Sequence, residues 1–271
     1  LIRVRQFTIS EGHYILRPDQ LEQEFKGCLE LAKYFLDTVG LLENCTFRFS
    51  QWDPENKNNK YEGTKEQWEE AQRVMGNILD HLGLDYTIGI DEAAFYGPKL
   101  DVNVKPAIGN EITLSTCQLD FCLPMRFDLK YVDKDGNKKT PVVLHRAILG
   151  SLDRFMAYIL EETKGALPTW LAPNQVNIIP VNNEYHLEYA TDLLNKLRDK
   201  EFRVELDSRD EKMGYKIREA QTKKIPYTLV LGNNERDNNT ITYRKYGEES
   251  TTTMSTEEFI TMIEEQIKEY K

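Results

Sequence analysis

The chain has 271 residues, of which 40% are hydrophobic and 30% are charged, close to the averages of globular proteins. This composition excludes a disordered tail, a collagen-like repeat and a coiled rod, and the length is that of about two domains. The formal net charge of -10 argues against sequence-independent binding of nucleic acid over the whole surface, although a local basic patch is compatible with it.

No run of about 18 apolar residues and no signal peptide is found, so we expect a cytoplasmic protein. The four cysteines have no C-x-x-C spacing and are expected to be reduced and mostly buried: Cys28, Cys45, Cys117 and Cys122. Because the chain begins with Leu1 and a strand-like pattern starts at once, we expect that an upstream piece is missing.

The first half predicts an antiparallel sheet with helices. Apolar and β-branched residues at 1–9 and 13–16 predict a hairpin, interrupted by the polar S-E-G at 10–12. Apolar residues at helical spacing predict helices at residues 18–40, after Thr64 and from Gly150. Thr64 and Gln67 form a capping box. Further strands are expected at residues 45–50, 86–90, 100–104, 111–120 and 126–132, and their short connections favour antiparallel pairing.

The second half alternates strands with helices. Strands are expected at residues 176–181, 202–206, 227–231 and 240–246, and helices at residues 184–200, 214–221 and 256–270. This order predicts a small three-layer α/β domain with a mostly parallel sheet. The two prolines of L-P-T-W-L-A-P are typical of a stiff link. We therefore expect one domain at residues 1–167, a linker at 168–173 and a second domain at 174–271.

Two of the four histidines are candidates for a metal site. His13 and His145 lie on or beside strands of the antiparallel half, and their imidazoles could share a metal if those strands are neighbours. An ordinary role in the core or at the surface is the alternative for both. That ordinary role is the interpretation adopted for His81 and His186.

Several cations stand where they could meet an anion. Arg3 and Arg5 alternate on one face of the first predicted strand with Phe7 next on that face, which would suit phosphate groups and a stacked base. Arg154 occupies the first turns of a predicted helix, whose N-terminus favours anions. Lys99 follows a rigid Tyr-Gly-Pro turn. Solvated surface positions and turn chemistry are the simpler explanation for each of these cations taken alone.

Six separated motifs stand in a fixed order: R-V-R-Q-F-T…H, A-F-Y-G-P-K-L-D, T-x-Q-L-D-F-x-L-P-x-R-F, H-R-A-I-L-G-S-L-D-R-F, P-T-W-L-A-P-x-Q-V and R-D-E-K-x-G-Y-K-I-R-E-A. Together they resemble the C-terminal half of the threonyl-tRNA synthetase family. The resemblance implies an α+β class II synthetase catalytic core with an antiparallel sheet, incomplete at its N-terminus, followed by a small three-layer α/β anticodon-binding domain. It also implies a ligase that activates threonine with ATP and transfers it to the 3′ end of its cognate tRNA, as a homodimer in the complete protein.

The resemblance implies roles for residues of the first domain. Those implied in catalysis are Arg3, Glu11, Tyr96, Lys99 and Gln118, and those implied in binding ATP with magnesium are Arg3, Phe7, Thr116, Ser151 and Arg154. In particular, Phe7 would stack on adenine, Arg154 would hold the γ-phosphate, and Glu11 would pair with the amino group of threonine.

His13 and His145 match two of the family's three zinc ligands. A zinc that binds the amino and hydroxyl groups of threonine would separate it from valine, which an apolar pocket cannot do strongly. The third ligand of the family is a cysteine upstream of the matched region, and neither Cys117 nor Cys122 is expected to replace it. With two protein ligands, zinc is expected to bind this chain weakly.

In the second domain, the positions that match the family's anticodon contacts are Asp210, Lys212, Lys224, Glu235 and Arg244. Three of them fall in the cation-rich stretch 209–224, for which a solvated helix face is the alternative. Asp210 stands for the usual asparagine and Lys224 for a usual arginine, and lysine lacks the guanidinium fork that reads a base edge.

Departures from the family pattern leave a second hypothesis open. I-S-E-G-H at 9–13 stands where the family usually has Q-D-D-A-H, and Thr113 and Ser115 also depart from it. The alternative is therefore a catalytically silent paralogue that acts as an RNA-binding or regulatory module. A prolyl- or histidyl-type relative shares the domain plan but matches the histidine pair and the A-F-Y-G-P-K run less well.

Overall fold

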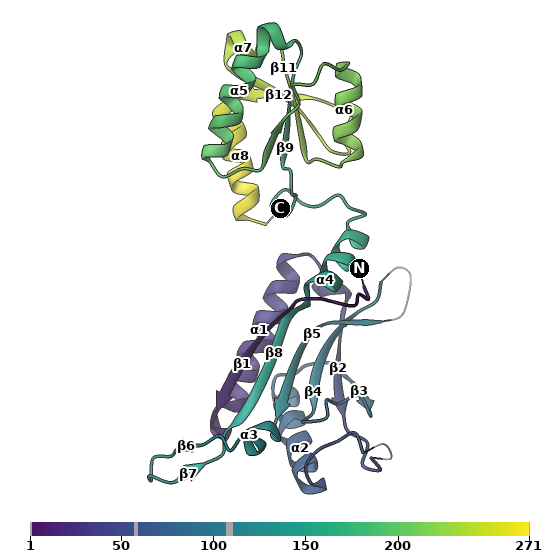
Figure 1. Cartoon of the computed structure of the whole chain (residues 1–271), viewed down its shortest axis with the longest axis vertical. Helices are drawn as coiled ribbons and strands as arrows, with labels where there is room; N and C mark the ends of the chain where they lie inside the picture. Colours follow the sequence, from purple (N-terminus) through teal and green to yellow (C-terminus); the bar gives the residue numbers. More distant parts are fainter. Residues whose placement is uncertain (1, 57–58, 107–110, 271) are drawn as a thin grey trace. The chain divides into compact units, whose positions relative to one another are not determined.

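The chain folds as two units, which a computed structural model describes over residues 2–56, 59–106 and 111–270. One unit comprises Leu1–Glu161 and the other Glu162–Lys271 (Figure 1). None of the helices in the described residues combines the length and the apolar character that a membrane span requires.

A six-stranded sheet forms the centre of the first unit, in the order β1-β8-β5-β4-β2-β3 (Figure 1). Its strands are β1 (Ile9–Leu16), β2 (Cys45–Gln51), β3 (Thr87–Ile90), β4 (Lys99–Val104), β5 (Ile112–Asp120) and β8 (Val142–Ser151). Neighbouring strands pair antiparallel, except β2 and β3, which are parallel. The predicted antiparallel sheet is therefore confirmed, with one parallel pair at its edge.

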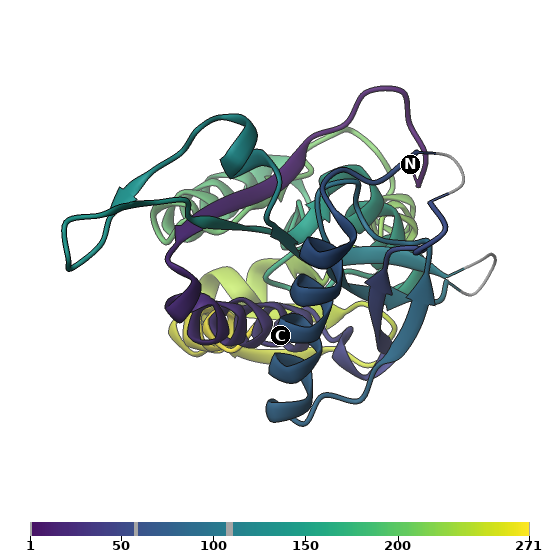
Figure 2. The ribbon, with the colours of Figure 1, turned by 90° about the horizontal axis from the view of Figure 1, so that it is seen from below.

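Two helices cover one face of this sheet. They are α1 (Leu21–Thr38), which follows the short 3-10 helix η1 (Pro18–Gln20), and α2 (Lys65–His81). Phe25 and Leu29 of α1 and Leu79 of α2 share a buried core with Leu119 of β5 and Leu144 of β8. Helix α1 is seen nearly end-on in Figure 2, with the strands of the sheet on one side of it. Because side chains alternate along a strand, the neighbours of Leu119 and Leu144 face the opposite side of the sheet.

The capping box at the start of α2 is confirmed. Thr64 Oγ1 accepts the backbone N–H of Gln67 at 3.3 Å, and the side chain of Gln67 accepts the backbone N–H of Thr64 at 2.8 Å. We expect Thr64→Ala to lower the free energy of unfolding by about 1 kcal/mol, because an N–H at the helix start loses its acceptor. Urea unfolding measures this loss, and Thr64→Ser, which keeps the hydroxyl, is the control. An equal loss in both variants would contradict the capping role.

The hairpin predicted at the start of the chain is wrong. Residues 2–8 form no strand, and β1 instead runs from Ile9 through the polar S-E-G to Leu16. Its partner is β8, with a register shift between Ser10 and Gly12. Pairing with the distant strand β8 therefore accommodates the polar residues 10–12 as an irregularity of the ladder, although their composition indicated a turn.

The strand predicted at residues 126–132 is wrong for most of its length. The structure has a short helix and a small two-stranded ribbon here: α3 (Leu123–Arg126), β6 (Tyr131–Val132) and β7 (Lys138–Lys139). The helix forms because the carboxylate of Asp120 accepts two backbone N–H groups at its start, at 2.9 Å each, and Pro124 suits the first turn.

The helix predicted from Gly150 begins later. β8 continues through Gly150 to Ser151, and α4 (Leu152–Glu162) follows directly. Gly150 has a φ of +63°, and a Cβ on it would lie 2.1 Å from the carbonyl oxygen of Leu114. The change from strand to helix therefore requires glycine at this position.

The second unit holds a five-stranded sheet in the order β10-β9-β11-β12-β13. Its strands are β9 (Val176–Pro180), β10 (Val204–Leu206), β11 (Tyr227–Leu231), β12 (Thr240–Lys245) and β13 (Thr252–Ser255). β9 is parallel to β10 and β11, whereas β12 is antiparallel to β11 and β13. The expectation of a mostly parallel sheet is therefore wrong for half of the strand pairs, because β12 and the unpredicted β13 extend the sheet without crossover helices.

Helices cover both faces of the second sheet. They are α5 (Asn183–Asp199), α6 (Met213–Thr222), α8 (Thr256–Lys268) and the short α7 (Asn233–Asn238), which was not predicted. Figure 1 shows α6 on one face and α5 and α8 on the other, which confirms the three layers.

Residues 168–173, expected to form a linker, pack on the second unit. Arg203 donates to the carbonyl oxygens of Trp170 and Ala172 at 2.7 and 2.8 Å, and Thr169 donates to Gln266 at 2.9 Å. The division between the units falls earlier, between Glu161 and Glu162. These hydrogen bonds hold the proline-containing segment as part of the second unit.

Candidate active site

A cavity of about 320 Å³ opens on the face of the first sheet opposite α1 and α2. Eight residues predicted from the sequence line it: Phe7, Glu11, Tyr96, Thr116, Gln118, His145, Ser151 and Arg154. Ile9, Thr113, Leu114, Ala147 and Gly150 complete the lining. Within the described residues, the lining does not include Arg3, His13 or Lys99. The structure therefore brings most of the predicted residues of the first domain to one cavity, although they come from four separate stretches of the chain.

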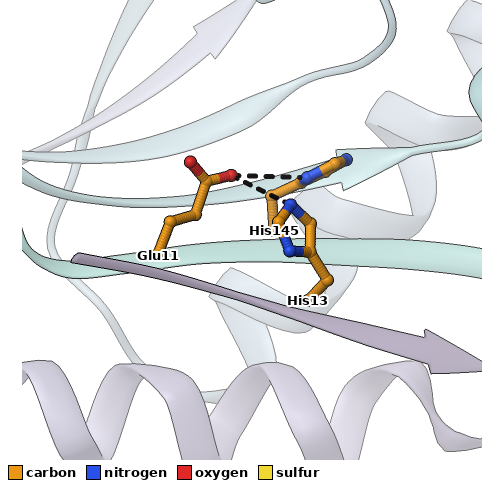
Figure 3. Close-up of side chains that lie close together, drawn as sticks. All are labelled: Glu11, His13 and His145. Atoms are coloured by element: carbon orange, nitrogen blue, oxygen red, sulfur yellow. Dashed lines mark ion pairs between the residues drawn. The ribbon is translucent and has the colours of Figure 1, made fainter. Parts of the chain in front are cut away.

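The two candidate metal ligands lie on neighbouring strands. His13 of β1 and His145 of β8 are opposite each other in the antiparallel pair, with ring centroids 4.7 Å apart. Oε1 of Glu11 lies 3.2 Å from Nε2 of His13 and 3.5 Å from Nδ1 of His145 (Figure 3). Ligand atoms of the three residues all fall within 4.8 Å of one another. Two imidazole nitrogens and a carboxylate oxygen suit zinc, so these side chains fit the metal that the resemblance implies.

The cysteines take no part in this cluster. Cys117 is buried in the core under the helices, because Thr116 and Gln118 on either side of it face the cavity. Cys122 is buried beside Glu62, whose carbonyl oxygen accepts its Sγ–H at 3.4 Å. Three of the four cysteines are buried and Cys45 is partly exposed, which confirms the expectation of mostly buried cysteines.

Asp120 is a buried residue of the site that the sequence prediction missed. Its side chain is fully buried, and its Oδ2 lies 2.9 Å from Nε2 of His145. It follows Thr116 and Gln118 at intervals of two along β5, so strand alternation could have identified it. A carboxylate on the second nitrogen of a ligating histidine is typical of metal sites.

Tyr96 and Gln118 form a hydrogen-bonded pair beside the histidines. The Tyr96 hydroxyl donates to Oε1 of Gln118, and the amide of Gln118 donates to Oγ1 of Thr116 at 3.3 Å. The Tyr96 ring lies 5.1 Å from the ring of His145. Burial, with smaller contributions from the charges of Glu11 and Asp120, raises the pKa of Tyr96 to about 12. The phenol therefore stays protonated at neutral pH and acts as a hydrogen-bond donor.

Lys99 points into a second polar cluster on the same sheet. Its ammonium group pairs with the carboxylate of Asp101, two residues further along β4, and Asp101 also accepts the hydroxyl of Ser50 at 2.7 Å. Asp101 is buried and was not predicted from the sequence. Lys99 lies opposite Gln118 in the pairing of β4 with β5, so the two clusters adjoin each other.

At the other end of the cavity, Arg154 lies in the first turn of α4. Its guanidinium donates to the carbonyl oxygen of Thr113 at 3.1 Å, and its backbone N–H donates to Oγ of Ser151 at 3.4 Å. Its Nε is buried and has no hydrogen-bond partner among the described residues. A guanidinium with spare donors at a helix N-terminus is suited to an anion such as phosphate.

The departures from the family pattern differ in their positions. Ile9 and Thr113 line the cavity, whereas Ser115 is buried and donates to the carbonyl oxygen of Ile148. The hydroxyl of Thr113 donates to Asn103 at 2.7 Å. Ile9, Thr113 and Glu11, which stands for an aspartate of the pattern, therefore change the surface that a bound molecule would meet, whereas Ser115 does not.

The five predicted anticodon residues belong to the second unit. Asp210 and Lys212 are exposed between β10 and α6, and Arg244 lies on β12. Glu235 of α7 accepts the backbone N–H of Gly232 at 2.9 Å and the hydroxyl of Thr242 at 2.7 Å, which fixes its side chain. Lys224 follows α6, and its ammonium group donates to the carbonyl oxygen of Lys164.

Some of the cations in the stretch 209–224 make contacts within the second unit. Lys216 is buried and donates to the carbonyl oxygen of Asp207 at 3.0 Å. Arg209 pairs with the carboxylates of Asp207 and Glu219 at 2.6 and 2.8 Å, and Lys223 pairs with Glu219 at 3.1 Å. The local excess of cations is therefore smaller at the surface than the sequence indicated.

Comparison with known proteins identifies both units. Residues 1–163 match the tRNA synthetase class II core domain (G, H, P, S and T), and residues 175–266 match the anticodon binding domain. A solved structure described as the RNA binding domain of threonyl-tRNA synthetase from Cryptosporidium parvum superimposes with a TM-score of 0.87 at 33% identity, covering 97% of this chain and 64% of that one. A prolyl-tRNA synthetase from Cryptosporidium parvum, solved with L-proline and AMP, superimposes with a TM-score of 0.68 at 18% identity over 99% of this chain and 52% of that one, which shows the fold alone.

Two curated relatives at about 50% identity are both threonine–tRNA ligases. A threonine–tRNA ligase of Oceanobacillus iheyensis is 50% identical over 271 residues, which are 100% of this chain and 42% of that protein. A threonine–tRNA ligase of Staphylococcus carnosus is 51% identical over 268 residues, which are 99% of this chain and 41% of that protein. The chain thus spans about two fifths of the length of these relatives. With its core and anticodon-binding domains and its similarity to threonine–tRNA ligases over its whole length, the chain belongs to the class II tRNA synthetase family.

Proposed function

We propose that this chain carries the amino-acid-activating and anticodon-binding parts of a threonine–tRNA ligase. The observation that supports this most directly is a single cavity that has His145 and Glu11 at one end, with His13 beside them, and Arg154 at the other. The first end offers ligands for a metal and an amino acid, and the second offers donors for phosphate. Joining an amino acid to ATP requires both kinds of group on one surface.

At the amino-acid end, His13 and His145 would hold zinc, with Glu11 beside them. Zinc bound there would act as a Lewis acid toward the amino and hydroxyl groups of threonine. The Glu11 carboxylate would pair with the substrate ammonium, and the hydroxyl oxygen of Tyr96, whose single hydrogen is donated to Gln118, would be an acceptor next to it. This site selects for a hydroxyl group, and valine, which has the same shape but no hydroxyl, would leave polar groups unpaired.

At the nucleotide end, Arg154 would hold the γ-phosphate of ATP bound with magnesium. Phe7 is exposed at the cavity and would stack on adenine, and Thr116 and Ser151 would contact the nucleotide with their hydroxyl groups. Arg3 is exposed ahead of β1 and would reach the phosphates. We assign Lys99, with Asp101, to the polar wall behind Gln118.

The second unit would bind the anticodon of the cognate tRNA through Asp210, Lys212, Lys224, Glu235 and Arg244. Two hydrogen bonds hold the carboxylate of Glu235 in one orientation for base reading. A homodimer of the complete protein and a cytoplasmic location belong to the same proposal.

Exchange of pyrophosphate into ATP tests the proposal, because it requires formation of the adenylate. We expect exchange with threonine but not with valine, proline or histidine, and weaker exchange with serine, which keeps the hydroxyl but lacks the methyl group. The assay is made with the chain and with a chimaera in which the chain replaces the matching 268 residues of the Staphylococcus carnosus ligase.

The outcomes separate the hypotheses. Exchange with threonine in either protein supports the ligase. A chimaera that folds and binds tRNA but shows no exchange with any amino acid would favour the silent paralogue, which the replacement at Ile9 in the cavity wall motivates.

A further inference from the structure

We propose that Asp120 is a positioning residue for the metal site: it keeps a proton on Nε2 of His145, so that the lone pair of Nδ1 remains available to the metal. This inference rests on the proposed function for the identity of the metal and its substrate. The position of the proton, however, follows from the described residues alone and can be measured without any ligand.

The carboxylate of Asp120 is held in one orientation. It stands at the last residue of β5, is fully buried, and its Oδ1 accepts the backbone N–H groups of Cys122 and Leu123 at 2.9 Å each. Oδ2 is therefore directed at Nε2 of His145, which lies 2.9 Å away. Because α3 begins at these N–H groups, the carboxylate of Asp120 contacts both the start of α3 and His145.

This arrangement decides which ring nitrogen carries the proton. An ionised carboxylate only accepts hydrogen bonds, so Nε2 of His145 must donate. A neutral imidazole has one N–H group, which leaves Nδ1 with its lone pair. Nδ1 lies 3.5 Å from Oε1 of Glu11, the same atom that lies 3.2 Å from Nε2 of His13 (Figure 3). The free lone pair of His145 thus points at the centre of the candidate metal site.

A proton on Nδ1 of His145 would be less stable in this structure than a proton on Nε2. If Nδ1 carried the proton, it would face the half-exposed carboxylate of Glu11 at 3.5 Å, and Nε2 would direct a lone pair at the buried carboxylate of Asp120 at 2.9 Å. Two facing lone pairs in a buried position are strongly unfavourable. Asp120 therefore controls the proton, and Glu11 does not.

Asp120→Asn is the informative variant, because an amide has one oxygen where the carboxylate has two. The amide oxygen must accept the N–H groups of Cys122 and Leu123, so the amide nitrogen faces Nε2 of His145. Nε2 must then accept, and the proton moves to Nδ1, which can no longer bind a metal. The opposite amide orientation would place N–H groups against the backbone N–H groups at the start of α3.

The readout is the ¹⁵N NMR signal of the histidines at about pH 8.5, roughly two units above the ordinary histidine pKa of about 6.5. We expect Nε2 of His145 to give a pyrrole-type signal in the unsubstituted chain and a pyridine-type signal in Asp120→Asn. His186 is an internal reference, because its Nδ1 accepts the backbone N–H of Asn182 at 3.1 Å and its Nε2 faces Asn233. Zinc affinity, measured by competition with a chromogenic chelator, should fall about 10- to 100-fold in this variant.

Asp133→Asn is the matched control. Asp133 also accepts two backbone N–H groups with one oxygen, at 2.9 and 2.8 Å, and pairs with Lys139 at 2.9 Å with the other, but it lies outside the cavity. We expect it to leave the His145 signals and zinc affinity unchanged. Glu11→Gln should also leave the proton on Nε2, even though it removes a group beside the metal.

The proposal is overturned if Nε2 of His145 is pyridine-type in the unsubstituted chain, or if Asp120→Asn leaves the signals unchanged. Should Asp120→Asn fail to fold, the unsubstituted chain and Glu11→Gln still test the proposal. A proton that moves from Nε2 to Nδ1 of His145 in Glu11→Gln would show that Glu11, and not Asp120, sets its position. Absence of threonine-dependent exchange would refute the proposed function but would not affect the measured position of the proton on His145.

Discussion

Arg154→Gln should weaken the binding of ATP by about 10- to 100-fold and leave the binding of AMP unchanged. The guanidinium donates to the carbonyl oxygen of Thr113 and keeps a buried Nε without a partner in the described residues. If those spare donors meet the γ-phosphate, their loss removes charge-assisted hydrogen bonds worth about 1.5–3 kcal/mol. AMP has no γ-phosphate, so its affinity does not depend on this side chain. Calorimetric titration with each nucleotide in the presence of magnesium measures the difference.

Arg146→Gln is the control for this variant. Arg146 lies on β8 between His145 and Ala147, with its guanidinium 5.0 Å from the centre of the ring of Tyr14, and does not line the cavity. Its substitution removes the same charge from the same unit, and both nucleotides should bind as before. An equal loss of ATP and AMP affinity in Arg154→Gln would show that Arg154 supports the cavity wall and would contradict its assignment to the γ-phosphate.

Gly97→Ala should lower the free energy of unfolding by about 2–3 kcal/mol, at the upper end of the usual cost of overpacking. A Cβ on Gly97 would lie 1.7 Å from the carbonyl oxygen of Leu119, which is backbone and cannot turn away. The turn is also tied to β5, because the N–H of Leu119 donates to the carbonyl oxygen of Pro98 at 3.0 Å. Urea unfolding monitored by tryptophan fluorescence measures the loss.

The same substitution should reach the site, because Tyr96 precedes Gly97 and its hydroxyl donates to Gln118. Gly27→Ala is the control in the same unit, since Gly27 lies within α1 and nothing is within 4 Å of its added Cβ. There alanine should stabilise the helix by about 0.5–1 kcal/mol. A Gly97→Ala protein as stable as the unsubstituted chain would mean that the turn is not packed against β5.

The cavity shows both the strength and the limit of sequence reasoning. Arg154 and Tyr96 could be singled out because each stands in a motif of fixed local form, a helix start and a rigid turn. Their meeting with His13 and His145 depends on the order of strands in the sheet, which places β1 beside β8 and β8 beside β5. Periodicity along one strand carries no information on its neighbours.

Asp120 illustrates a different limit. The alternation Thr116, Gln118, Asp120 could have placed it on the cavity face, but its partners are two backbone N–H groups and His145. The same contacts produce α3, which occupies the connection that was expected to lead directly into a strand at residues 126–132. A buried carboxylate that must be satisfied sets the structure of this connection, which local preferences do not indicate.

The amino-acid sequence by itself determined the organisation in two parts, the long helices α1, α2, α5 and α8, and membership of the synthetase family. These depend on helical periodicity, on capping residues such as Thr64, and on motifs that are contiguous in the chain. Only the tertiary structure decided where β1 begins, that the second sheet is half antiparallel, and that His13, His145 and Asp120 converge. Pairing between distant strands and the satisfaction of buried polar groups set these features, and both depend on residues far apart in the sequence.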